Sequence, residues 1–265
     1  MARKRNAVRS RNQKVVLRED VRKAIEQVWP EGVVDMTFDP EESYFHRLMP
    51  RLERAFLRIN GARLVHERAA KGNSIWDEAA DPEEDPPAYT ENSRSYHLFF
   101  VCPEGEAFTY ETETEIIDEE ALADQFEEGS WESEPMVTVP GRGWIGCALA
   151  ISLLAPFAVI SLNDRSVFED GSSTEPEIEL NIENEDGDSV HQEEHFRELI
   201  GEKAFAILQA LRGKISAILE KLGIAVLPEE EWRKPVSWLK GGEEAFVGTH
   251  GEPIRVLEAF FFEGL

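Results

Sequence analysis

An uncharged run of 20 residues, positions 143–162, limits how this chain can fold more than any other feature of its sequence. The run, GWIGCALAISLLAPFAVISL, lies in a chain of which 31% is charged, so it has to be removed from water. Its length just reaches that of a membrane-spanning helix. Against a span, Pro156 divides the run, and Arg142 and Arg165 near its two ends give no positive-inside bias. We therefore expect two buried strands that turn near Ala155 and Pro156, with a buried helix and a membrane span as the alternatives.

Hydrophobic periodicity predicts three helices in the rest of the chain. Apolar residues recur at helical spacing over about 16–29, 43–60 and 193–222. Pro50 lies inside the second pattern, so that helix either kinks at Pro50 or begins near it. Gly201 and Gly213 weaken the third pattern without reversing it.

Alternation of apolar and polar residues predicts strands that complete an α+β fold. Besides those of the uncharged run, the expected strands cover residues 97–102, 107–115, 178–182, 224–227, 245–247 and 254–262. We expect the first two to form a hairpin around residues 103–106, and the last two to form another around residues 249–252. Residues 118–128 predict a short acidic helix. Because helices come first and a long helix lies between sheet segments, we expect an α+β protein with an antiparallel or mixed sheet.

Charge divides the chain into a basic front part and an acidic remainder. The whole sequence holds 28 Lys+Arg against 53 Asp+Glu, for a net charge of −25. Residues 1–71 nevertheless carry a net charge of +6, and the remaining residues carry −31. Together with the prolines, this contrast predicts four parts. They are a basic tail (1–18), a basic helical segment (19–72), an acidic Pro-containing linker or loop (73–94) and an acidic α+β body (95–265).

The first 18 residues contain seven cationic side chains and no acidic one. No apolar stretch follows them, so a secretory signal peptide is excluded, whereas a mitochondrial transit peptide shares their composition. Such a segment is either a solvated tail or an arm that contacts the phosphates of a nucleic acid. We expect a soluble cytoplasmic protein with no membrane partner.

Four arginines form the most organised polar feature of the sequence: Arg47, Arg51, Arg54 and Arg58. On a helix over residues 43–60 they form a stripe that points away from the apolar face. A solvated helix face explains this pattern. A site for a partner or an anion explains it as well, because guanidinium groups one turn apart suit phosphates or a row of carboxylates.

The segment His191-Gln192-Glu193-Glu194-His195 resembles the H-x-x-E-H motif of inverzincin zinc peptidases. The resemblance implies that His191 and His195 bind zinc and that Glu194 acts as the general base on a metal-bound water. When the phase of the 193–222 helix is continued backward, both histidines lie opposite the core face. The alternative is therefore a polar helix start, in which Glu193 and Glu194 favour the helix dipole.

Other signs of chemistry are weaker. Cys102 and Cys147 lie in apolar surroundings and are expected to be buried thiols, with a nucleophile as the alternative. Trp232 and Trp238 either cover the edge of a core or form an aromatic contact surface. We hypothesise a non-catalytic protein that binds a partner protein through charge complementarity, such as an inhibitor or immunity-type protein with an acidic face. The alternatives are a zinc-dependent hydrolase, and a nucleic-acid-binding protein that uses its basic N-terminal part.

Overall fold

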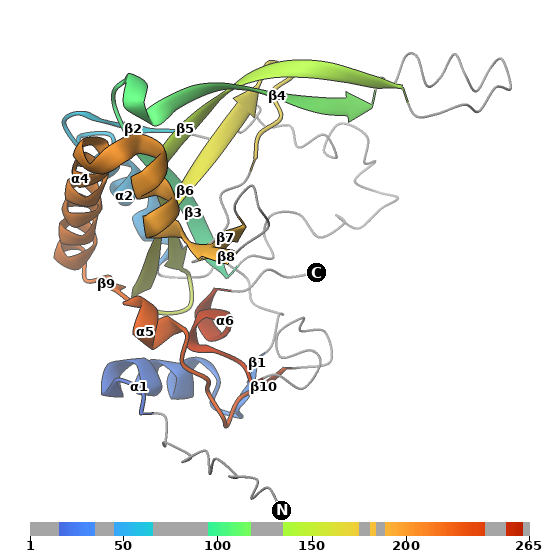
Figure 1. Ribbon diagram of the computed structural model, residues 1–265. Coiled ribbons are helices and arrows are strands. Elements are labelled where there is room, and N and C mark those ends of the chain that lie inside the picture. The colour runs from blue at the N-terminus through green and yellow to red at the C-terminus, as the bar shows by residue number, and fades with distance from the viewer. Residues whose placement is uncertain are drawn as a thin grey trace, which may run out of the picture.

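A mixed six-stranded sheet with helices on both faces forms the centre of the molecule (Figure 1). The computed structural model describes residues 16–34, 45–65, 95–117, 135–174, 181–183, 189–241 and 253–261. The strands of the main sheet are β2 (Ala62–Leu64), β3 (Tyr96–Pro103), β4 (Thr109–Ile117), β5 (Met136–Ser152), β6 (Phe157–Phe168) and β9 (Ala225–Val226). Their order is β2-β3-β5-β6-β9, and β4 also pairs with β5. The α+β prediction is confirmed.

Short elements surround this sheet. Two small sheets pair β1 (Val33–Val34) with β10 (Lys240–Gly241), and β7 (Asn181–Glu183) with β8 (Ser189–His191). The helices are α1 (Glu19–Val28), α2 (Met49–Phe56), α4 (Gln192–Lys221), α5 (Glu229–Trp232) and α6 (Val256–Phe260), with short 3₁₀ turns η2 (His46–Leu48) and η4 (Glu106–Phe108). The expected helix over 16–29 is confirmed as α1. The second helix begins near Pro50, which occupies its first turn, where a missing N–H costs nothing.

The uncharged run forms the antiparallel hairpin β5–β6, as predicted. Its turn is stabilised by Ser152, whose buried hydroxyl accepts hydrogen bonds from the backbone N–H groups of Leu154 and Ala155 at 3.1 and 3.3 Å. Within the described ranges, no helix is long and apolar enough to cross a membrane.

The predicted hairpin between β3 and β4 is wrong, although both strands exist. They pair with the same strand: β4 with residues 136–144 of β5, and β3 with residues 147–152. Both are antiparallel to β5, so they run in one direction and follow each other along one edge of it. The 3₁₀ turn η4 joins them without reversing the chain. A strand of 17 residues is long enough to pair with two partners in succession.

The C-terminal hairpin prediction is also wrong, because its second arm is the helix α6. Val256, Ala259 and Phe260 are spaced to lie on one side of a helix turn, and all three are buried. Glu258 stabilises the start of the helix by accepting a hydrogen bond from the backbone N–H of Arg255 at 2.6 Å. Short apolar runs fit a strand and a helix turn equally well. The expected strand at 245–247, the helix at 118–128 and residues 178–180 lie outside the described residues.

The long helix α4 bends sharply at Gly201, where the sequence predicted continuity. Gly201 has φ 77° and ψ 158°, a conformation that interrupts the helix. Arg212 and Glu193 nevertheless form an ion pair of 2.6 Å. In a straight helix these residues would be roughly 28 Å apart. The two pieces of α4 therefore fold toward each other, as Figure 1 shows.

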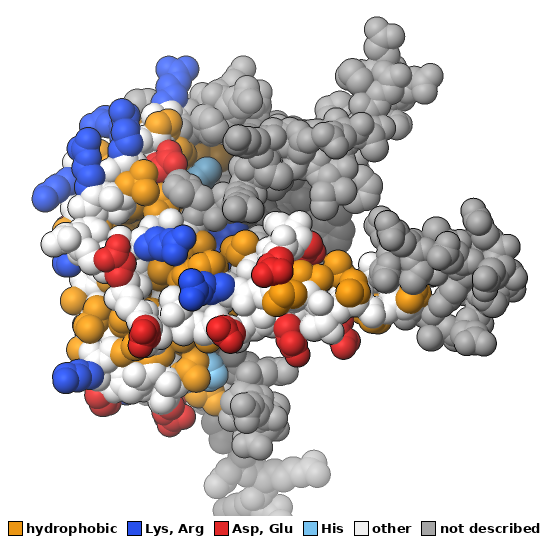
Figure 2. Space-filling view, turned by 90° about the horizontal axis from the view of Figure 1, so that it is seen from above, with side chains coloured by type: hydrophobic (Ala, Val, Ile, Leu, Met, Phe, Trp, Pro, Cys, Tyr) orange, Lys and Arg blue, Asp and Glu red, His pale blue; other side chains and the backbone are white. Residues whose placement is uncertain are grey.

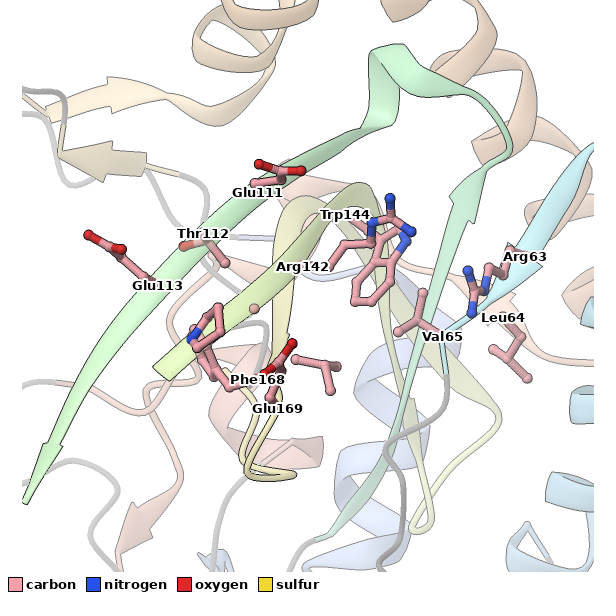
Figure 3. A pocket seen from close by; sticks show the side chains of 13 residues that line it. Arg63, Leu64, Val65, Glu111, Thr112, Glu113, Arg142, Trp144, Phe168 and Glu169 are labelled. Carbon is pink, nitrogen blue, oxygen red and sulfur yellow. The ribbon is translucent and has the colours of Figure 1, made fainter. Parts of the chain in front are cut away.

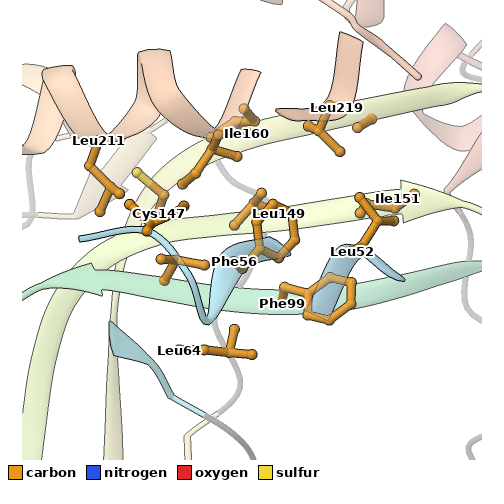
Figure 4. Packing of buried hydrophobic residues seen from close by; sticks show 14 of the residues in the cluster. Leu52, Phe56, Leu64, Phe99, Cys147, Leu149, Ile151, Ile160, Leu211 and Leu219 are labelled. Atoms are coloured by element: carbon orange, nitrogen blue, oxygen red, sulfur yellow. The ribbon is translucent and has the colours of Figure 1, made fainter. Parts of the chain in front are cut away.

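Helices α2 and α4 cover one face of the sheet and enclose the larger core (Figure 4). Odd-numbered residues of β5 face this core, including Cys147, Leu149 and Ile151, and all three are fully buried. They pack between Leu52 and Phe56 of α2 and the apolar side of α4. Residues 45–65 thus share a core with the later strands, and β2 pairs with β3.

The opposite face is covered in part by α1, α5 and α6. Ala150 and Val159 of the sheet belong to the same second core as Val21 and Ile25 of α1. The indole N–H of Trp29 donates a hydrogen bond of 2.9 Å to the carbonyl of Ala259, which ties the N-terminal helix to the C-terminal one. The division of the chain into four parts stays a prediction.

Candidate functional site

The four predicted arginines lie together on the outer side of η2 and α2. Leu52 and Phe56 point into the core, and this orientation leaves Arg47, Arg51, Arg54 and Arg58 exposed. We call these four residues the arginine row. Arg51, Arg54 and Arg58 line a shallow hollow of about 220 Å³. The Arg54 side chain donates a hydrogen bond of 2.9 Å to the carbonyl of Pro50, which fixes its direction along the helix.

No acidic side chain among the described residues neutralises the arginine row. Every ion pair found in the described ranges involves other cations. The space-filling view shows several Lys and Arg side chains gathered at one end of the molecule with one acidic side chain beside them, while other basic side chains lie among the acidic ones (Figure 2). The sequence thus correctly predicted an exposed basic stripe, and its ligand stays a prediction.

Negative charge lies along β4, which follows β3 along the same edge of β5. Glu111, Glu113 and Glu115 alternate with half-buried residues, so all three carboxylates are exposed on one face of the strand. We call these three residues the acidic edge. Within the described part of the chain, β4 pairs with β5 alone, which leaves its outer edge open.

The end of β4 extends past the rest of the sheet. Residues 113–117 pair with residues 136–140 of β5, but β6 pairs with β5 only from Gly141 onward. The result is a two-stranded ribbon that projects from the body (Figure 1). Large apolar side chains are exposed at its end, namely Ile117 (41%), Met136 (51%) and Val137 (41%). The acidic edge is thus continuous with an exposed apolar tip.

Tyr110 fastens β4 to the body at the base of this ribbon. Its ring lies across Gly143 of β5, where a Cβ atom would stand only 2.1 Å from the ring carbon Cζ. The phenol O–H donates a hydrogen bond to Asp164 and lies 3.3 Å from the Ser166 hydroxyl, both on β6. Burial, and then the hydrogen bond to Asp164, raise the pKa of Tyr110 to about 12. The side chain therefore stays neutral and links three strands.

A groove of about 1480 Å³ lies on the sheet face opposite α2 and α4, between β2 and the base of the ribbon (Figure 3). Trp144 forms its floor, and the Arg63 guanidinium lies 5.4 Å from the centre of the indole ring. Arg142 stands directly across from Glu111 in the strand register. Glu113 and Glu169 also line the groove, so both signs of charge surround an aromatic floor.

Neither the groove nor the acidic edge was assigned as a site from the sequence. The glutamates were visible in TYETETE, but only the pairing of β4 shows that they follow an open edge. The groove combines residues from four strands, and no short motif brings Arg63 near Trp144. The residues of the groove come together only in the folded protein, so no spacing in the sequence predicts it.

The H-x-x-E-H segment starts α4 and is used for local structure. The His191 ring accepts a hydrogen bond from the backbone N–H of Glu193 at 3.3 Å, and its other nitrogen lies 3.1 Å from a carboxylate oxygen of Glu229. His195 packs edge-on against Phe196, and Glu194 is exposed. In the ranges that the structure describes, no three His, Cys, Asp or Glu residues are arranged to hold a metal ion.

The two cysteines are buried thiols, as expected. Burial raises the pKa of Cys102 to about 11 and that of Cys147 to about 12, so neither is a thiolate near neutral pH. Trp232 is buried in the smaller core. Trp238 is exposed, and the Arg22 guanidinium lies 5.5 Å from its ring.

Comparison with known proteins identifies no relative, since no family model, curated protein or solved structure matches the chain.

Proposed function

We propose that this protein binds a partner protein without catalysing a reaction, and that the partner presents a basic segment to the acidic edge of β4. The observation that carries the proposal is the acidic edge itself, exposed along an open strand that ends in an apolar tip. An inhibitor or immunity-type protein that neutralises a basic partner would use such a surface.

The strand geometry suits an extended ligand. Successive glutamates on one face of β4 lie roughly 7 Å apart, the repeat of alternate residues in any strand. A partner segment added alongside β4 would therefore pair its own alternate lysines or arginines with this row, while backbone hydrogen bonds supply affinity. Ile117 and Met136 at the tip add apolar contact area that a bare carboxylate row lacks.

Charge also favours a basic partner over a nucleic acid at this site. The net charge of −25 and the acidic edge repel phosphates, and they speed encounter with cationic surfaces at low salt. The described part of the chain offers no geometry that supports the zinc-hydrolase hypothesis.

The test uses a defined peptide. A fluorescent peptide of alternating Lys and Thr, eight residues long, is titrated with the protein at low and moderate salt, and its anisotropy is measured. We expect binding that weakens with salt. Glu111→Gln, Glu113→Gln and Glu115→Gln together should weaken it by about tenfold, because each exposed ion pair contributes about 0.5 kcal/mol.

A matched control removes the same charge elsewhere. Glu31, Glu198 and Glu220 are exposed and lie on other elements, so their triple change to Gln should alter the affinity less than twofold. Absence of peptide binding by the unmodified protein at low salt would refute the proposal. Equal weakening by both triple variants would reduce it to a general charge effect, which also refutes it.

A second candidate function is nucleic-acid binding by the arginine row together with residues 1–18. The favouring observation is that the row is exposed and not neutralised by any described acid. It predicts an affinity for single-stranded oligonucleotides that falls steeply with salt. No binding at low salt would eliminate it.

A further inference from the structure

Two rows of opposite charge occur on one molecule and do not contact each other. The arginine row lies on the outer side of α2, and the acidic edge lies on β4. Neither row forms an ion pair with the other or with any other charged side chain in the described ranges. Within the described part of the chain, both rows therefore carry charge that no ion pair neutralises.

The two rows have matching dimensions. Arg51 and Arg54 lie on α2 and Arg58 lies two residues beyond its end, so the three span roughly 10 Å at the helical rise of 1.5 Å per residue. Glu111 to Glu115 span roughly 13 Å along a strand that rises about 3.4 Å per residue. Three cations can therefore meet three carboxylates in register, and guanidinium groups favour paired hydrogen bonds to carboxylates.

We infer that the arginine row of one copy docks on the acidic edge of a second copy, so that the chain associates with itself head to tail. This inference rests on the proposed function, since it names a partner for the same acidic edge. The two surfaces differ, so the contact is heterologous and leaves one free row at each end of a dimer. Association therefore continues into rings or open chains.

Ionic strength decides whether the local attraction exceeds the repulsion between two molecules that each carry −25. At about 0.01 M salt the Debye length is roughly 30 Å, and the net charges repel across the whole molecule. At about 0.15 M it is roughly 8 Å, so distant charges are screened while side chains in contact still attract. At about 1 M both effects are weak. Association should therefore be strongest at moderate salt.

The experiment measures weight-average mass by sedimentation equilibrium of the full chain at these three salt concentrations. Two variants are compared. The first changes Arg47, Arg51, Arg54 and Arg58 to Glu, and the second changes Glu111, Glu113 and Glu115 to Lys. Circular dichroism and thermal unfolding verify that each variant is folded.

The unmodified protein should exceed twice the monomer mass at about 0.15 M salt and should dissociate at about 1 M. Each variant alone should be monomeric, because its two rows carry the same sign. In an equimolar mixture the unchanged rows of the two variants have opposite signs, and so do their two reversed rows, so the variants should associate with each other although neither associates alone. A chain with both rows reversed should associate again.

A control variant changes exposed lysines outside the row, Lys203, Lys214, Lys221 and Lys240, to Glu. It carries the same charge change as the first variant and should still associate. A monomeric unmodified protein at every salt concentration would overturn the inference. So would a mixture of the two variants that stays monomeric.

The outcomes separate this inference from the proposed function. If the basic peptide binds the acidic edge while the protein stays monomeric, the partner is a different protein and only self-association fails. If the peptide does not bind but the mixed variants associate, the acidic edge recognises the helix surface of α2, and the strand-addition mode of the proposed function fails. If neither occurs, both fail.

Discussion

The two halves of strand β5 differ in burial and in strand pairing. The inner half, residues 143–152, is buried at every position and lies between β3 or β4 on one side and β6 on the other. The outer half, residues 136–142, exposes most of its side chains, and its first five residues pair with β4 alone. The inner half therefore stabilises the fold, while the outer half holds a charged strand edge away from the body.

The difference is visible in the proline and glycines of the outer half. Pro140 lies just beyond the last pairing with β6, where a strand tolerates a missing N–H. Gly141 and Gly143 leave room for the rings of Phe168 and Tyr110, which cross over them. The ribbon is thus attached to the body through aromatic side chains at its base.

The largest expected effect is a difference in the free energy of unfolding between one variant in each half of β5. Leu149→Ala should lower the free energy of unfolding by about 2–5 kcal/mol, because this side chain is fully buried and its loss leaves a cavity. Val137→Ala, at a half-exposed position of the outer half, should change it by less than about 0.5 kcal/mol. Urea unfolding followed by tryptophan fluorescence measures both. Similar values for the two variants would contradict the division of β5.

A smaller effect is expected where the two halves meet. Gly143→Ala should cost about 1–3 kcal/mol, because the new methyl group displaces the Tyr110 ring and its hydrogen bonds to β6. In a Tyr110→Ala background the same change should cost much less. Unfolding of the two single variants and the double variant measures this coupling. Additive costs would show that Tyr110 does not fasten the ribbon.

The smallest effect concerns the bend in α4, which packs over the inner half. Gly201→Ala should destabilise the protein by about 1 kcal/mol, since a side chain is strained at φ +77° although no atom lies within 4 Å of its Cβ. Gly213→Ala, on a regular helix turn with equal space, should stabilise it by about 0.5–1 kcal/mol. Thermal unfolding measures the opposite signs. Stabilisation by both changes would mean that the helix is straight in solution.

Much of the fold follows from the sequence where the local pattern has one interpretation. The uncharged run with its central proline gave the β5–β6 hairpin, and helical spacing gave α1, α2 and α4. The C-terminal apolar run has two interpretations at that length, and α6 proved to be a helix where a strand was expected. The sequence indicated that Gly201 weakens the predicted helix. Only the ion pair between Glu193 and Arg212 shows that the chain turns there.

The candidate surfaces divide in the same way. The sequence by itself determined that four arginines share an exposed helix face, because helical geometry fixes which residues lie together. It also predicted a strand over residues 107–115, in which alternate glutamates share one face. Only the tertiary structure decided that β4 continues the line of β3 along β5 and so has an open edge, and that Arg63 covers Trp144. Strand partners and cross-strand contacts join residues far apart in the chain, and local periodicity carries no information about them.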